Sequence, residues 1–149
     1  MRTINEIIIH CSDTRPDQDI TAAIVDEWHR LKGWDCIGYH FFIRLDGTIE
    51  AGRPIAKIGA HCYGHNANSI GICYAGGMER RGEQKIYLDT RTTEQKRAMY
   101  YLLTILLHCY PSIKKISGHN QYENKACPCF KVQDEYGQLV KYAKEHKFY

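Results

Sequence analysis

The sequence predicts a single α/β domain in which a central mixed β-sheet is flanked by helices. Short apolar runs alternate with longer amphipathic segments, in the order strand, helix, hairpin, strand, helix, strand, helix. The length of 149 residues is that of one domain. No internal repeat, low-complexity tract or Pro/Ser-rich linker marks a second domain, so residues 1–149 are predicted to fold as one unit.

The first third of the chain supplies a strand, a helix and a hairpin. Residues 4–11 are predicted to form a strand buried on both faces, because three isoleucines follow one another. Residues 19–32 have helical periodicity. The predicted apolar stripe of this helix consists of Ile20, Ile24, Trp28 and Leu31. Residues 39–44 and 48–51 flank an Asp-Gly pair that tolerates positive φ, which predicts a hairpin.

The middle of the chain is expected to contain a long loop, a strand and an exposed segment. Residues 59–68 are rich in glycine, histidine and asparagine and are expected to be the loop. Residues 70–74 are apolar and are predicted to be a buried strand. Residues 78–91 are mostly polar, so we expect them to form an exposed excursion from the sheet.

The clearest helix is predicted at residues 92–109. Thr92 and Gln95 have the spacing of a capping box at its start. Its predicted apolar face consists of Met99, Leu102, Leu103 and Leu106. A short strand at 113–117 and a terminal helix at 132–146 complete the expected order of elements.

Composition and charge exclude several classes of protein. A net charge of +3 is too small to predict a nucleic-acid partner, for which a concentrated basic face is expected. Seven cysteines, an odd number, are more typical of a reducing cytoplasm, where thiols stay free for packing or for metal. The first apolar run stops at His10 and no segment reaches membrane-spanning length. We therefore expect cytoplasmic synthesis without a signal peptide or membrane anchor.

One short segment, GHNQYENKACPCF at 118–130, is crowded with reactive side chains. His119 and Cys127 supply the imidazole nitrogen and thiolate that zinc prefers, and a catalytic zinc needs a third protein ligand. His10, at the end of the first strand, is a candidate for it. Spacing alone leaves other interpretations open. His10 can be a hydrogen-bonded surface histidine, and Cys127 and Cys129 can be packing residues or a C-x-C redox pair.

Four separated motifs occur in the order in which one family has them. They are HCSDT from His10, GYHFFIRLDGTIEAGR from Gly38, GAHCYGHNANSIGI from Gly59, and the H-x(5)-K-x-C pattern that begins at His119. With them, almost the whole chain resembles the zinc-dependent N-acetylmuramoyl-L-alanine amidases of the phage-lysozyme type. Their superfamily includes the peptidoglycan recognition proteins, and the resemblance implies the same fold.

The resemblance also implies roles for individual residues. The implied ligands of Zn²⁺ are His10, His119 and Cys127, and the implied catalytic residues beside the metal are Tyr39 and Lys125. His61 and Asn66 are implied to form a wall of the substrate groove. Cys129 departs from the family pattern, where a residue without a thiol is expected. It could therefore compete with Cys127 for the metal or be oxidised against it.

The implied reaction is hydrolysis of the amide that joins N-acetylmuramic acid to L-alanine in peptidoglycan. The implied partner is peptidoglycan or a muropeptide, and the protein is expected to be a monomer. A phage or prophage lysis enzyme, released to the wall by a pore or a secretion system, fits best. The alternatives are a cytosolic amidase that recycles muropeptides, for which an acidic third ligand is typical, and a peptidoglycan-binding module without activity.

Overall fold

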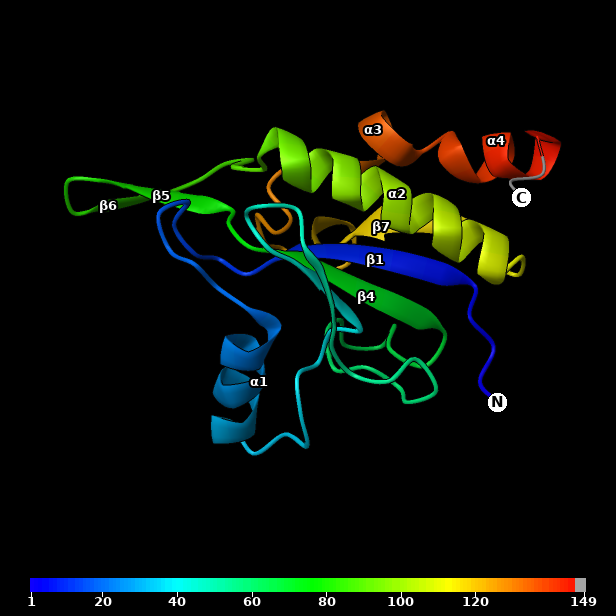
Figure 1. The fold of residues 1–149 in the computed structure, drawn as a ribbon, viewed down its shortest axis with the longest axis horizontal. Helices are drawn as coiled ribbons and strands as arrows, with labels where there is room; N and C mark the ends of the chain where they lie inside the picture. Colours follow the sequence, from blue (N-terminus) through cyan, green and yellow to red (C-terminus); the bar gives the residue numbers. More distant parts are fainter. Residues whose placement is uncertain (147–149) are drawn as a thin grey trace.

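A five-stranded mixed sheet forms the centre of the protein in the computed structural model, which describes residues 1–146 (Figure 1). Its strands are β1 (Glu6–Cys11), β2 (Phe41–Ile43), β3 (Ile49–Ala51), β4 (Ser69–Tyr74) and β7 (Lys115–Gly118), in the spatial order β3-β2-β4-β1-β7. Strands β2 and β3 pair antiparallel, and the other neighbours pair parallel. The predicted α/β class with a mixed sheet is therefore confirmed.

The two faces of the sheet are covered by different helices, and Figure 1 shows α1 and α2 on opposite sides of β1 and β4. The larger core lies under α2 (Thr93–Cys109), α3 (Val132–Tyr136) and α4 (Leu139–His146), and it includes Ile7 and Ile9 of β1. A smaller core lies under α1 (Ala22–Leu31). Because side chains alternate across a strand, His10 points to the face opposite Ile7 and Ile9.

Several local predictions are confirmed. Both central strands, β1 and β4, are buried along their whole length. The Asp-Gly turn joins β2 to β3, with Gly47 at φ 87°. Helix α2 begins with the predicted capping box: the Thr92 side chain accepts from the backbone N–H of Gln95, and the Gln95 side chain accepts from that of Thr92. Residues 59–68 form a loop, as expected.

The predicted apolar stripe of the first helix is right for Ile20, which is buried, and for Ile24, which packs against the smaller core, but wrong for Trp28 and Leu31. Helix α1 begins at Ala22, after the N-cap Thr21, and it buries Ala22, Val25 and His29. By contrast, Trp28 is 40% exposed and Leu31 is 81% exposed. The helix contacts the sheet through a narrow face of smaller side chains, and this leaves Trp28 on the side of the cleft described below.

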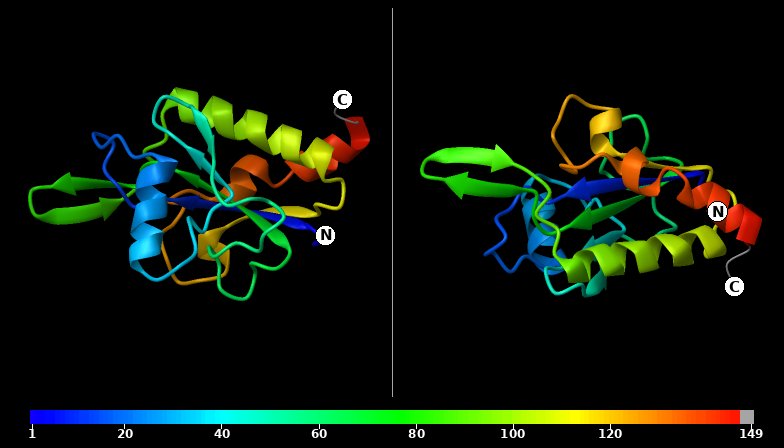
Figure 2. Two further views of the ribbon diagram at one scale, coloured as in Figure 1. Left: turned by 60° about the horizontal axis from the view of Figure 1, so that its bottom comes forward. Right: turned by 90° about the horizontal axis from the view of Figure 1, so that it is seen from above.

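The segment at 78–91, expected to be an exposed excursion, forms a hairpin that is followed by a buried arginine. Strands β5 (Met78–Arg81) and β6 (Gln84–Tyr87) form a separate two-stranded sheet that projects from one end of the molecule (Figure 2). Arg91, predicted to be exposed, has a fully buried side chain. Its guanidinium donates to the carboxylates of Asp89 and Glu135 and lies 3.5 Å from the centre of the Phe130 ring. Buried arginine is tolerated here because both carboxylates compensate its charge.

The predicted terminal helix at 132–146 is divided into α3 and α4. The division falls at Gly137, whose N–H still bonds to the Gln133 carbonyl, but which is a poor helix former. A single 3₁₀ turn, η1 (His119–Gln121), follows β7 directly. Within residues 1–146, no helix has the length and apolar character needed to cross a bilayer.

Because His40 is buried, we predict that the protein loses stability in mild acid. Its Nδ1 accepts from the Gly71 N–H at 3.0 Å and its Nε2 donates to the Lys57 carbonyl at 2.9 Å, so the ring is neutral in the fold. Burial lowers the pKa of His40 from 6.5 to about 4. Between these two pH values the unfolded chain binds more protons than the folded protein. The contribution of His40 to the free energy of unfolding is therefore complete above pH 6.5 and declines as the pH falls toward 4.

We expect His40 to account for about 3 kcal/mol of this decline in the free energy of unfolding. Urea denaturation of the wild type and of His40→Asn, measured from about pH 7 to about pH 4.5, checks the expectation. The variant keeps an acceptor for the Gly71 N–H, and its stability should fall less steeply as the pH is lowered. Carboxylates titrate in both proteins, so their contributions to the pH dependence of stability cancel when the two are compared. Equal slopes would contradict the prediction.

Candidate metal centre

Three residues from separate parts of the chain meet at one edge of the sheet. His10 lies near the carboxyl end of β1, and its side chain is fully buried. His119 follows β7, whose last residue, Gly118, pairs with Ile9. Because parallel strands end at the same edge, this register brings the two histidines together. Cys127 arrives on the loop after η1, and its Sγ accepts from the Cys11 N–H at 3.2 Å.

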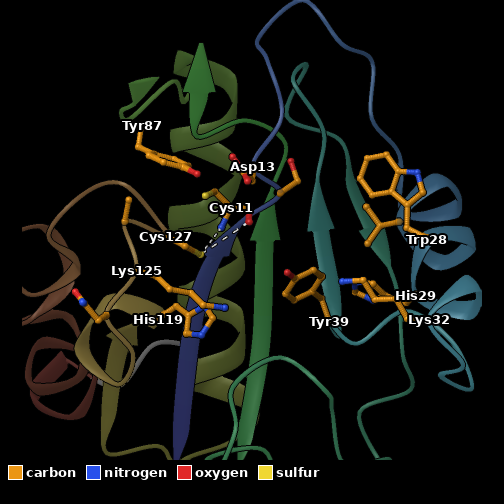
Figure 3. Close-up of a pocket in the computed structure, with 14 residues that line it drawn as sticks. Cys11, Asp13, Trp28, His29, Lys32, Tyr39, Tyr87, His119, Lys125 and Cys127 are labelled. Atoms are coloured by element: carbon orange, nitrogen blue, oxygen red, sulfur yellow. Dashed lines mark hydrogen bonds between the residues drawn. The ribbon is translucent and has the colours of Figure 1, made fainter. Parts of the chain in front are cut away.

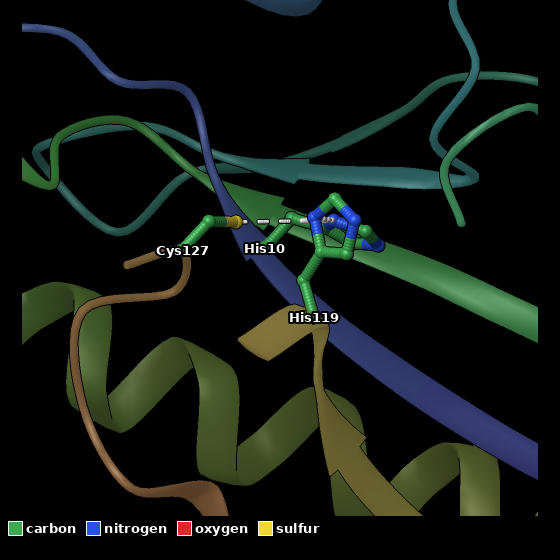
Figure 4. Close-up of side chains that lie close together, drawn as sticks. All are labelled: His10, His119 and Cys127. Carbon is green, nitrogen blue, oxygen red and sulfur yellow. Dashed lines mark hydrogen bonds between the residues drawn. The ribbon is translucent and has the colours of Figure 1, made fainter. Parts of the chain in front are cut away.

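The separations of His10 Nδ1 from the other two ligand atoms are close to those around a tetrahedral zinc ion. His10 Nδ1 lies 3.1 Å from His119 Nδ1 and 3.9 Å from Cys127 Sγ. All three ligand atoms lie within 4.8 Å of one another (Figure 4). In a tetrahedral site, Zn–N distances of about 2.0 Å and Zn–S distances of about 2.3 Å give about 3.3 Å between two nitrogens and about 3.5 Å between nitrogen and sulfur. The donor set and its geometry therefore fit zinc.

The outer nitrogens of both imidazoles have hydrogen-bond partners that leave Nδ1 free for a metal. His119 Nε2 is bonded to the carboxylate of Glu123, and this bond lowers the pKa of Glu123. His10 Nε2 lies 2.9 Å from His61 Nδ1. Burial lowers the pKa of His10 well below its ordinary value and that of His61 to about 3, so both rings are neutral at neutral pH. Metal binding requires neutral imidazole.

Glu123 was not identified from the sequence. A signal existed, because Glu123 lies four residues after His119 and a turn of helix brings such residues together. A carboxylate behind a metal-binding histidine is a common arrangement that fixes the ring. Glu123 also lies 3.8 Å from Lys125 Nζ, so one carboxylate contacts both a predicted ligand and a predicted catalytic residue.

Tyr39 and Lys125, the predicted catalytic residues, both line a cleft beside the three ligand atoms. The Tyr39 ring centre lies 5.1 Å from that of His10. Burial is the main cause that raises the pKa of Tyr39 well above its ordinary value, and the nearby thiols add to it. The Tyr39 hydroxyl therefore stays protonated and can donate a hydrogen bond. The Lys125 side chain is 57% exposed and supplies a cation at the cleft.

The cleft has a volume of about 940 Å³ and is lined by side chains of both signs together with aromatic rings (Figure 3). Figure 3 shows Tyr87 of β6 and Trp28 of α1 on opposite sides of it. Asp13 also lines the cleft and accepts from Lys85 of β6 at 2.7 Å. The hairpin thus contributes one wall and α1 the other.

His61 and Asn66, predicted to form a wall of the substrate groove, do not line this cleft. His61 is 9% exposed and lies behind His10. The Asn66 side-chain oxygen accepts from the backbone N–H groups of His61 and Cys62, at 2.9 and 3.0 Å. Both residues therefore organise the loop at 59–68. The sequence does not reveal on which side of the loop each side chain lies, and a role of these residues in the substrate groove stays a prediction.

Cys129 is not part of the group of three ligand atoms found among residues 1–146. Its Sγ lies 3.1 Å from the Gly77 carbonyl oxygen and 3.9 Å from Cys11 Sγ. Its backbone has φ 69°, the left-handed region, so the chain turns between the two cysteines of the C-x-C segment. The geometry selects Cys127 as the candidate ligand.

Comparison with known proteins points to one family. The family described as N-acetylmuramoyl-L-alanine amidase matches residues 1–130. The endolysin of Escherichia phage T7 is 38% identical over 127 residues, which are 85% of this chain and 82% of that protein. The endolysin of Enterobacteria phage T3 is 37% identical over 131 residues, with 88% and 84% covered.

Solved structures agree with the sequence comparison. The amidase LysC from Clostridium intestinale superposes with a TM-score of 0.76 at 30% identity, covering 93% of this chain and 86% of that chain. Drosophila PGRP-LB has a TM-score of 0.73 at 26% identity, with 92% and 81% covered. With a family match over residues 1–130 and these neighbours in sequence and fold, the chain belongs to the N-acetylmuramoyl-L-alanine amidases.

Proposed function

We propose that the protein hydrolyses the amide bond between N-acetylmuramic acid and L-alanine in peptidoglycan, at a zinc ion held by His10, His119 and Cys127. The observation that carries the proposal is the convergence of two imidazoles and one thiol beside a large cleft, in a member of an amidase family. Three protein ligands leave one position open, which is the arrangement of catalytic rather than structural zinc sites.

The residues around the ligands supply the other requirements of amide hydrolysis. When bound, zinc supplies Lewis acidity toward a carbonyl oxygen and lowers the pKa of a water molecule. The Lys125 ammonium and the Tyr39 hydroxyl line the cleft and are the groups that we assign to stabilising the oxyanion that develops as the amide is attacked. Glu123, bonded to His119 and close to Lys125, holds both in place.

We further propose that residues 1–149 act as one amidase domain and as a monomer, with peptidoglycan as partner. The similarity to phage endolysins favours a lysis enzyme that acts on the wall after release through a pore. The Cys127 thiol at the third ligand position argues against a recycling amidase, for which an acidic ligand is typical. The complete set of ligand and catalytic side chains argues against a module that only binds.

Digestion of purified peptidoglycan should release intact stem peptides with a free N-terminal alanine, as detected by mass spectrometry. A chelator should abolish the release, and added zinc should restore it. Sugar fragments with unbroken peptide attachments would show that a different bond is cut. Intact sacculi and soluble anhydro-muropeptides, offered side by side, would separate a lysis enzyme from a recycling enzyme.

Exchange of each cysteine in the C-x-C segment tests the ligand assignment. We expect Cys127→Ser to lose zinc on dialysis, because a hydroxyl is a much weaker ligand than a thiolate. The matched variant Cys129→Ser should retain about one zinc per chain. Atomic absorption measures the metal content of both proteins. Loss of zinc from Cys129→Ser alone would transfer the ligand role to Cys129.

Removal of the Lys125 ammonium should separate metal binding from catalysis. We expect Lys125→Ala to bind zinc as the wild type does but to hydrolyse peptidoglycan about 10²–10³-fold more slowly, the usual cost of losing one oxyanion donor. Zinc content and initial rates are measured on the same preparation. The control is Lys114→Ala, an exposed lysine of the loop before β7. A Lys125→Ala enzyme with wild-type activity would remove this residue from the mechanism.

A further inference from the structure

We propose that His61 is a positioning residue that holds the His10 imidazole in the orientation in which Nδ1 faces the metal position. The inference rests on the proposed zinc site and assigns His61 a role inside the protein rather than on the cleft wall. It starts from a difference between the two ligand histidines. His119 is supported by the carboxylate of Glu123, whereas His10 is supported by a second imidazole.

The contacts form a directed chain of three side chains. His10 Nδ1 faces His119 Nδ1 and Cys127 Sγ, so the proton of a neutral His10 ring belongs on Nε2. That N–H donates to His61 Nδ1 at 2.9 Å. A neutral His61 then carries its own proton on Nε2, which lies 3.2 Å from the Ser69 hydroxyl oxygen. Each ring therefore fixes the tautomer of the next, and the chain ends on β4.

The backbone is shaped to seat the His61 ring. A Cβ added at Gly71 of β4 would lie 2.6 Å from His61 Cδ2 and Cγ, and one added at Gly59 would lie 2.7 Å from His61 Cδ2. The absence of a side chain at both positions creates the space that the imidazole fills. From the other side, Asn66 accepts from the His61 backbone N–H at 2.9 Å and fixes the loop.

Burial explains why an imidazole rather than a carboxylate supports His10. The His61–Ser69 pair lies inside the protein, with Ser69 fully buried and His61 9% exposed, whereas the Glu123 side chain is 34% exposed. An ionised carboxylate at the position of His61 would lose its hydration, while a neutral imidazole accepts the same hydrogen bond at a lower cost. Partners of this kind orient metal ligands and raise their affinity for the ion.

Zinc affinity, measured by competition with a chromophoric chelator, tests this role independently of catalysis. We expect His61→Leu, which removes the acceptor, to weaken zinc binding about 10–100-fold. His61→Asn places an amide oxygen near the position of Nδ1 and should restore most of the affinity. Gly71→Ala leaves His61 in the sequence but places a methyl group in the space that its ring occupies. This variant should weaken zinc binding as well. His65→Ala, at a loop histidine stacked on Tyr122, is the matched control and should bind zinc normally.

Thermal unfolding with and without zinc separates positioning from packing. A packing defect in His61→Leu lowers Tm equally in both conditions, whereas a positioning defect reduces the rise in Tm that zinc produces. Zinc affinity in His61→Leu within about twofold of the wild type, in a folded protein, would overturn the inference. If His61→Leu does not fold, normal affinity in Gly71→Ala would overturn it. A wild-type protein that binds no zinc would instead refute the proposed function.

Discussion

The parallel pairing of β1 with β7 is the constraint on which the candidate site depends. The register that sets Ile9 beside Gly118 carries His10, the next residue of β1, and His119, the residue directly after β7, to the same edge of the sheet. Their Nδ1 atoms lie 3.1 Å apart although 109 residues separate them in the chain. A shift of one residue in this pairing would turn one imidazole to the opposite face of the sheet. A shift would also force the isoleucines of β1, which are buried on both faces of the sheet, to repack.

Side chains alternate along β1, so its two faces serve different purposes. One face carries the residues that pack against α2 and the C-terminal helices. The other face carries His10, together with the loop that holds His61, and it borders the cleft. The stability of the domain and the chemistry of the site therefore use opposite sides of the same strand. This arrangement explains how a site of buried imidazoles is held rigidly next to an open cleft.

Local signals in the sequence were sufficient for most of the fold, since runs of isoleucine, an Asp-Gly turn and a capping box act over a few residues. The errors concern long-range contacts. The exposed position of Trp28 depends on the cleft, and the burial of Arg91 depends on Glu135, 44 residues away. The three candidate ligands could be predicted because their family motifs are in the sequence. The position of His61 behind His10 could not, because only the folded loop brings these rings together.

The β5–β6 hairpin has a consequence for how this scaffold can diversify. It forms a sheet of its own, joined to the main body through its two connections and the Lys85–Asp13 ion pair, and it carries Tyr87 into the cleft. The turn between β5 and β6 lies at the far end of a projecting arm (Figure 2). Residues can be added or removed there without altering any strand register of the central sheet. The length of the hairpin, and with it the area of a polymeric substrate that the enzyme can contact, can thus change in evolution without a change in the catalytic residues.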